Sequence, residues 1–184
     1  MRLATCILIL VILLAMVWYA PHYLAYANKP VKSDVIVLFI SQSFDARKRE
    51  VLKLLEEGYA SHIIVPAYGT TLKAPIANIP ITNKPITNYP KYLEETHIEV
   101  LEAKKMMEKA GFQTAIFVSS PFHMRRIKII AKRVFGDHYA NITFVPTRYA
   151  KKQSGFWLFA NYSKHVVSEY GKIVWFLGYA TFST

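Results

Sequence analysis

The sequence has little cysteine, few acidic side chains and none of the common motifs of catalysis. Its single cysteine, Cys6, lies in an apolar segment, which excludes both a disulfide framework and a cysteine metal site. No metal-binding cluster and no Gly-x-Ser-x-Gly elbow occurs in the chain. We therefore expect no metal site, and the sequence identifies no cofactor.

The charge balance is strongly basic. Twelve Asp and Glu residues stand against 23 Lys and Arg residues, which gives a formal net charge of +11. Such an excess is typical of proteins that contact nucleic acid, an anionic membrane surface or an acidic ligand. We expect no nucleic-acid partner, because no helix-turn-helix, zinc or RNA-reading signature accompanies the charge. Proximity to a membrane explains the excess more simply.

An almost unbroken apolar run, Leu3 to Ala20, follows Arg2 at the N-terminus. At a rise of ~1.5 Å per residue it just spans a hydrocarbon core of ~30 Å. Aromatic side chains at its far end are typical of the membrane interface; they are Trp18, Tyr19 and Tyr23. The alternative is a cleaved signal peptide, because Ala25-Tyr26-Ala27 resembles a cleavage site. We expect an uncleaved anchor over residues 1–24, in a single pass of the inner membrane with lipid as its partner.

The remaining chain, residues 33–184, is expected to form one domain outside the cytoplasm. Apolar runs at 34–40, 61–65, 115–118 and 141–145 predict strands, and amphipathic segments at 46–57, 96–110, from Pro121 onward and at 156–182 predict helices. This alternation predicts an α/β fold with a Rossmann-like parallel sheet and helices on both faces. The last segment carries too many charges for a second span, so we expect an amphipathic helix on the domain or on the membrane surface.

A proline repeat interrupts the alternation. Pro75, Pro80, Pro85 and Pro90 recur every five residues, a spacing that excludes both helix and central strand. We predict an extended, Pro-rich loop over residues 68–92, dispensable for folding but not for function. It serves as a lid, as a partner-binding arm or, equally well, as a tolerated insertion.

Two helix starts carry recognisable signals. Thr96-His-Ile-Glu99 has the form of a capping box, in which Thr96 and Glu99 bond each other's backbone amides. Ser120 is placed to cap the helix that follows, with Pro121 at the first helical position. The N-terminus of that helix would direct unpaired N–H groups and a positive dipole at a ligand.

Polar side chains follow the first and third predicted strands, at the edge where parallel sheets bind ligands. We expect Ser41, Gln42, Ser43, Ser119, Ser120 and His123 to converge on one crevice there. Arg126 would supply a bidentate grip on an anion, most simply a phosphate or carboxylate. Arg125 is assigned instead to an outward basic row with Lys128 and Lys132.

The segment Phe117-Val-Ser-Ser-Pro-Phe-His-Met-Arg-Arg126 resembles a signature of the SanA/YdcF/ElyC-like bacterial proteins, a hydrophobic strand and hydroxyl pair followed by His-Met-x-Arg. Asp34-Val-Ile-Val-Leu38 is similar to the opening strand of that family, and Arg47 to the arginine of its first helix. Thr96 with Glu99 is similar to its threonine-led helix, and Glu169-Tyr-Gly171 to its C-terminal helix. The resemblance covers about residues 33–178.

The resemblance implies a Rossmann-like domain, often behind a membrane anchor, with a role in the envelope barrier and in peptidoglycan biogenesis. It adds Arg47, Thr96 and Glu99 to the expected ligand-binding residues. One cytoplasmic branch of the family is associated with S-adenosylmethionine. This chain departs from the pattern where glycines are expected after the first two strands, at Ile40-Ser41-Gln42 and Pro66-Ala67-Tyr68. Close backbone approach to a ligand is harder there.

Three functions remain open from the sequence. The first is an envelope domain that binds a phosphate-bearing or lipid-linked anion and, as a hydrolase or transferase, processes it. His123 would then be the general acid or base, and Ser119 or Ser120 would bind or attack. The second is a non-catalytic, membrane-anchored module that contacts envelope proteins. The third is a protein that binds S-adenosylmethionine or a nucleotide.

Overall fold

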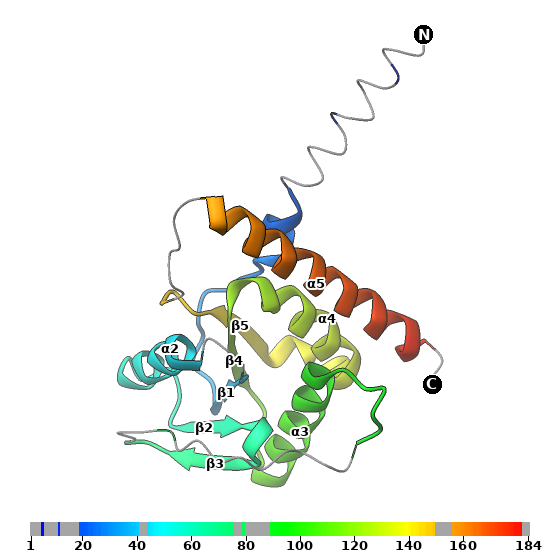
Figure 1. Ribbon diagram of the computed structural model, residues 1–184. Coiled ribbons are helices and arrows are strands. Elements are labelled where there is room, and N and C mark those ends of the chain that lie inside the picture. The colour runs from blue at the N-terminus through cyan, green and yellow to red at the C-terminus, as the bar shows by residue number, and fades with distance from the viewer. Residues whose placement is uncertain are drawn as a thin grey trace.

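The computed structural model describes Thr5, Val11 and residues 19–40, 44–75, 79, 89–149 and 156–181, without the side chains of 156–162. Its elements run in the order β1 (Val35–Leu38), α2 (Phe44–Glu56), β2 (His62–Val65), η1 (Pro66–Tyr68), β3 (Thr70–Lys73), α3 (Glu95–Ala110), β4 (Ala115–Ser119), η2 (Pro121–His123), α4 (Met124–Phe135), η3 (Gly136–Asn141), β5 (Ile142–Pro146) and α5 (Phe156–Ala180). Figure 1 shows their arrangement.

The strands form one sheet in the order β3-β2-β1-β4-β5. β2, β1, β4 and β5 are parallel, and β3 pairs with β2 in the antiparallel sense. The predicted α/β class and largely parallel sheet are therefore confirmed. β2 and β3 extend the sheet on one side of β1. The chain then crosses back and places β4 and β5 on the other side of β1, so the strand order reverses between β1 and β4. Ligands of such sheets bind beyond the carboxyl ends of the strands at this point.

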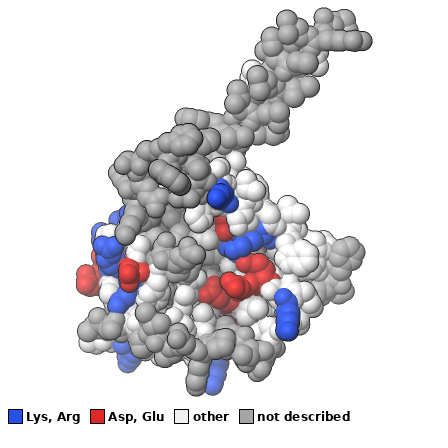
Figure 2. Space-filling model, viewed as in Figure 1, with Lys and Arg blue, Asp and Glu red and all other residues white. Residues whose placement is uncertain are grey.

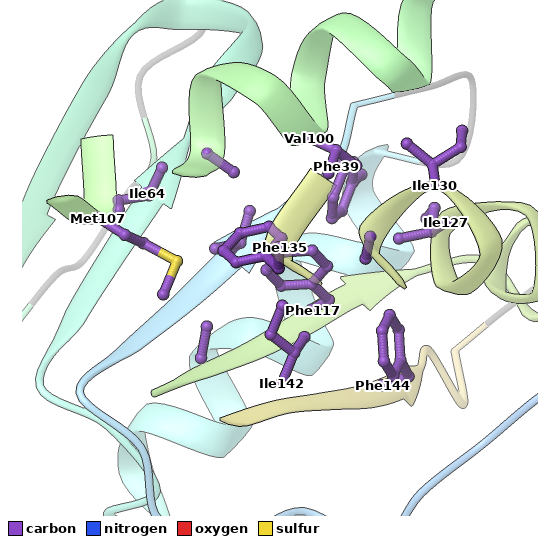
Figure 3. Packing of buried hydrophobic residues seen from close by; sticks show 14 of the residues in the cluster. Phe39, Ile64, Val100, Met107, Phe117, Ile127, Ile130, Phe135, Ile142 and Phe144 are labelled. Carbon is purple, nitrogen blue, oxygen red and sulfur yellow. The ribbon is translucent and has the colours of Figure 1, made fainter. Parts of the chain in front are cut away.

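Helices cover both faces of the sheet. Successive residues of a strand point to opposite sides, and β1 and β4 are buried at every position, so both sides need to be covered. On one face, Ile36 and Leu38 pack with Val51 and Leu54 of α2. On the other, Phe117 lies among the aromatic rings of Phe39, Phe135 and Phe144 (Figure 3). α3, α4, the strands and Phe176 of α5 supply the rest of this second cluster, and α5 lies outside α4 (Figure 1).

The predicted loop over residues 68–92 is wrong in its first part. Thr70–Lys73 forms β3, which adds an edge strand beside β2. An alternating pattern of half-buried and exposed residues, together with two threonines, suits a solvent-facing edge strand. Farther along, Ile79 is 2% exposed and belongs to the core on the α2 face. Most of the proline repeat, residues 76–78 and 80–88, lies outside the described residues.

Neither predicted helix cap forms as expected. Glu94, not Thr96, caps α3: its carboxylate accepts hydrogen bonds from the amides of Thr96 and His97. Ser120 precedes η2 without a side-chain cap, and Pro121 begins that turn as expected. The freed side chains of Thr96, Glu99 and Ser120 contact distant residues instead. A capping box read from spacing alone does not detect such competing partners.

The N-terminal segment after the apolar run packs on the domain. Leu24 is fully buried against Val166 and Ile173 of α5, and Asn28 bonds the backbone of Phe144 in both directions. Within the described residues, no helix combines the length and apolar character needed to cross a bilayer. The predicted span over residues 3–20 lies outside them, apart from Thr5, Val11, Tyr19 and Ala20.

Candidate functional site

A cavity of about 370 Å³ opens beyond the carboxyl ends of β1 and β4, where the strand order reverses. It brings together the residues that follow β1, the end of β4, residues of η1 and η2, and the N-terminal parts of α2, α3 and α4, with α5 on one side. The lining residues are Phe39, Ile40, Arg47, Ala67, Glu94, Glu95, Thr96, Ile98, Glu99, Ser119, His123, Arg126, Ile127 and Lys172. On the face shown in Figure 2, acidic and basic side chains gather side by side near the centre.

Arg47 is the most unusual residue of this cavity. Its side chain is 1% exposed, yet no carboxylate pairs with it among the described residues. Nη1 donates to the carbonyl of Phe39 at 2.7 Å and Nε to Ser120 Oγ at 3.1 Å, while Nη2 has no partner in the described part of the chain. Burial lowers the pKa of Arg47 to about 10, against the attraction of Glu99. The guanidinium is still charged at neutral pH, so the Nη2 amino group of a buried cation remains available to a ligand.

Ser119 lies at the end of β4 and presents a second unsatisfied atom. It is 1% exposed, and its Oγ has no hydrogen-bond partner in the described part of the chain. Unpaired polar atoms of this kind cost about 1–3 kcal/mol each when buried. An oxygen-rich anion in the cavity could satisfy both Ser119 Oγ and Arg47 Nη2.

Arg126 lines the cavity, as predicted, but two carboxylates already pair with its charge. It is buried at 3% exposure, but Nη1 pairs with Glu94 at 2.6 Å and Nε with Glu169 at 2.7 Å. Thr96 Oγ1 accepts a further hydrogen bond from Nη1. Two carboxylates thus more than neutralise its charge. Arg126 organises α3, α4 and α5 around the cavity, and Arg47 is the cation left for a ligand.

His123 is oriented by a carboxylate that the sequence analysis did not find. Its Nδ1 lies 2.9 Å from Glu169 Oε1 and 3.0 Å from Arg126 Nη2. Because Nη2 already donates to the same carboxylate oxygen, we assign the Nδ1 proton to the bond with Glu169. Nε2 is then the ring nitrogen left for a ligand. Burial lowers the pKa of His123, although Glu169 opposes the shift, so the ring is neutral at pH 7.

The two buried glutamates of the site differ in ionisation. Burial would raise the pKa of Glu169, but hydrogen bonds from His123 and Arg126 lower it to about 2. Burial raises the pKa of Glu99 to about 8, although its Oε1 accepts a hydrogen bond from the Ile40 amide. The raised pKa favours the protonated form of Glu99 near neutral pH, which lessens the negative charge beside Arg47. With Oε1 occupied, Oε2 is the natural position for its proton.

Most of the expected site residues that the structure describes lie together. Arg47, Thr96, Glu99, Ser119, His123 and Arg126 all line the cavity. Ser120 is connected to the cavity through Arg47, because its Oγ accepts a hydrogen bond from Arg47 Nε. Ser41, Gln42 and Ser43 lie outside the described residues. No group of three or more metal-ligating side chains occurs in the part of the chain that the structure describes.

Four charged residues that line or support the cavity were missed: Glu94, Glu95, Glu169 and Lys172. Glu94 stands directly before the α3 helix and has the charge of a good cap, so its position could have indicated it. Glu169 and Lys172 lie about 45 residues beyond His123, on a helix whose packing the sequence does not specify. The predicted basic row of α4 also differs: Arg125 and Lys128 lie over the rings of Tyr23 and Tyr26.

Comparisons of the chain with models of known protein families, with curated proteins and with solved structures find no significant match.

Proposed function

We propose that the cavity binds the anionic group of a phosphate-bearing ligand and that Arg47 is its principal contact. The observation that carries this proposal is a fully buried guanidinium that has, among the residues the structure describes, one unpaired nitrogen and no carboxylate partner. A buried cation without a counter-charge is costly, and an anion that satisfies it recovers that cost. Charge-assisted hydrogen bonds of this kind contribute about 1.5–3 kcal/mol each.

The rest of the cavity complements such a ligand. Ser119 Oγ can donate to an anion oxygen, and a protonated Glu99 can donate rather than repel. Lys172 of α5 supplies a second cation at the wall of the cavity. The aliphatic and aromatic lining, which includes Phe39, Ile98 and Ile127, lowers the local dielectric and strengthens these contacts.

The pairing of Glu169 with His123 favours a hydrolase or transferase over a purely passive binder. A carboxylate on Nδ1 holds the ring and leaves Nε2 to accept a proton from a nucleophile. Ser119 or water would be that nucleophile, and a neutral histidine is the form a general base requires. If no turnover occurs, the same groups make a non-catalytic binding module.

We further propose that the domain belongs to the bacterial envelope, as the resemblance to the SanA/YdcF/ElyC-like proteins implies, and is anchored outside the cytoplasm by residues 3–20. The packing of residues 21–28 supports an uncleaved chain. Cleavage after Ala27 would remove Leu24, which is fully buried, and Tyr26, which packs edge-on against Phe144. A signal peptide is normally discarded without loss to the domain.

The binding proposal is tested by calorimetric titration of the full-length chain in detergent with inorganic phosphate and with simple phosphomonoesters. Arg47→Met should weaken binding roughly tenfold to a hundredfold, the equivalent of 1.5–3 kcal/mol. Arg49→Met, two residues along the same helix but exposed and stacked on Tyr149, is the matched control and should leave affinity unchanged. Equal affinity in all three proteins, or no binding to any, would refute an anion site at Arg47.

A further inference from the structure

The outer side of α5 carries an exposed apolar face. Val167, Val174, Trp175 and Leu177 are 70%, 67%, 55% and 48% exposed, although apolar side chains of this size are normally buried. Gly171 and Gly178 are also exposed, and at helical spacing they fall on the same side as Val167 and Val174. Among these exposed positions, from Val167 to Gly178, there is no charged residue.

The opposite side of the same helix is fixed to the domain. Val166, Glu169, Ile173 and Phe176 are at most 8% exposed and pack on α4, on the core and on the N-terminal segment. The orientation of α5 about its axis is therefore set by buried contacts. The exposed apolar face is the side that these contacts leave uncovered.

The apolar N-terminal run ends directly beside this helix. Tyr170 of α5 donates a hydrogen bond to the carbonyl of Ala20 at 3.0 Å, and its ring stacks on Tyr23. The run of residues 3–20 thus joins the domain at the flank of α5, which lies along the side of the domain that the N-terminal segment leaves (Figure 1). If the run spans a bilayer, as proposed above, α5 lies next to the membrane surface.

The charges around this junction fit anionic lipid. Arg125 lies over the rings of Tyr23 and Tyr26, and Lys128 lies over Tyr26, at the root of the N-terminal segment. Lys164 is exposed near the start of α5. A second copy of this chain is a poorer occupant of the face, because each copy carries a net charge of +11 and the two would repel.

We propose that α5 is a membrane-surface helix whose face of Val167, Val174, Trp175 and Leu177 enters the boundary between headgroups and acyl chains. Such helices lie in the plane of the interface with the apolar side ~5–10 Å deep. Trp175 suits that depth, because its ring is apolar and its indole N–H is already bonded to the carbonyl of Tyr92. The domain would then be held by two contacts, which fix the orientation of the cavity relative to the bilayer.

The test uses the full chain in vesicles of phosphatidylcholine and phosphatidylglycerol. Cys6→Ala removes the native thiol, and a single new cysteine is labelled with an environment-sensitive fluorophore at Val174→Cys or Val167→Cys. Glu56→Cys, exposed on α2 across the sheet, is the matched control. We expect a blue shift and strong quenching by brominated acyl chains at positions 174 and 167, and neither effect at position 56.

The outcomes separate this inference from the anchor on which it rests. Flotation of the chain with the vesicles reports the anchor, and quenching reports α5. A chain that floats while labels at 174 and 167 remain in water overturns the α5 proposal and leaves the anchor standing. A blue shift without quenching, dependent on protein density in the vesicles, would mean a second copy covers the face and would equally overturn it. A chain that does not float refutes both.

Discussion

Two buried arginines line the same cavity with opposite electrostatic surroundings. Arg126 meets Glu94 and Glu169, whereas Arg47 meets a carbonyl and a hydroxyl and keeps one nitrogen unpaired. Burial costs each charge its hydration, and only pairing or a ligand recovers that cost. The first arginine therefore contributes to stability and the second to binding.

This difference predicts opposite effects of substitution in the ligand-free protein. Arg126→Met should lower the free energy of unfolding by about 3–5 kcal/mol, because two carboxylates lose their counter-charge. Arg47→Met should leave stability unchanged or raise it, because it removes an unpaired buried cation. Urea unfolding followed by circular dichroism measures both. A larger loss for Arg47→Met than for Arg126→Met would contradict the division of roles.

The raised pKa of Glu99 predicts how the stability of the fold depends on pH. The pKa of Glu99 is about 8 in the folded chain, against an ordinary value of 4.5 for a glutamate in the unfolded chain. Between these two pH values the folded state therefore holds a proton that the unfolded chain has released. Stability from this group is full below pH 4.5 and is lost as the pH rises through 8. Glu99→Gln, which cannot ionise, should thus gain stability relative to the parent between pH 5 and pH 8.5. The readout is the melting temperature at each pH, with Glu56→Gln at an exposed site of α2 as the control for the substitution itself. A difference between Glu99→Gln and the parent that does not change with pH would rule out the raised pKa.

At the scale of elements, the proline-rich segment contributes to the core through Ile79. A core isoleucine replaced by alanine typically costs about 2–5 kcal/mol. We expect a loss of this size for Ile79→Ala, which is 2% exposed, and less than about 0.5 kcal/mol for Val31→Ala, which is 59% exposed. Denaturant unfolding measures the free energy of unfolding of both variants. If Ile79→Ala loses as little stability as Val31→Ala, the segment is dispensable for folding, as the proline repeat indicated.

The elements show how far the sequence could be interpreted. The four parallel strands and four long helices follow from apolar runs and helical periodicity, because both patterns are local. β3 was missed because Thr70–Lys73 has no apolar run, and edge pairing with β2 depends on a partner distant in space. Prolines nearby then favoured a loop.

Some residues of the site could likewise be predicted from the local sequence, and others could not. His123 and Ser119 could be placed at one edge, because the ends of parallel strands meet there, whereas Arg47 was added only by the family resemblance. The pairing of Arg126 could not be predicted, because Glu94 and Glu169 come from two other helices and are brought to it only by packing. Local sequence indicates which residues reach the site, and tertiary contacts decide which of them remain free.

At the scale of the whole molecule, we expect the chain to remain attached to the membrane through residues 3–20. Leu24 and Tyr26 are packed on the domain, so a processed chain would lose part of its own core. Intact mass spectrometry of the protein purified from membranes should give a chain that still includes residues 1–27. A mature chain beginning at Asn28 would refute the anchor, and a reporter fused after Thr184 that is active only in the cytoplasm would refute the orientation.

The central claim is that an anion binds at Arg47, and anomalous diffraction from crystals grown with tungstate tests it most directly. Tungstate has the shape and charge of phosphate and can be located without ambiguity. We predict a strong peak inside the cavity, within hydrogen-bonding distance of Arg47 Nη2 and Ser119 Oγ, and no such peak in crystals of Arg47→Met. An empty cavity in the parent protein, with tungstate bound only at exposed lysines, would show that Arg47 does not hold an anion.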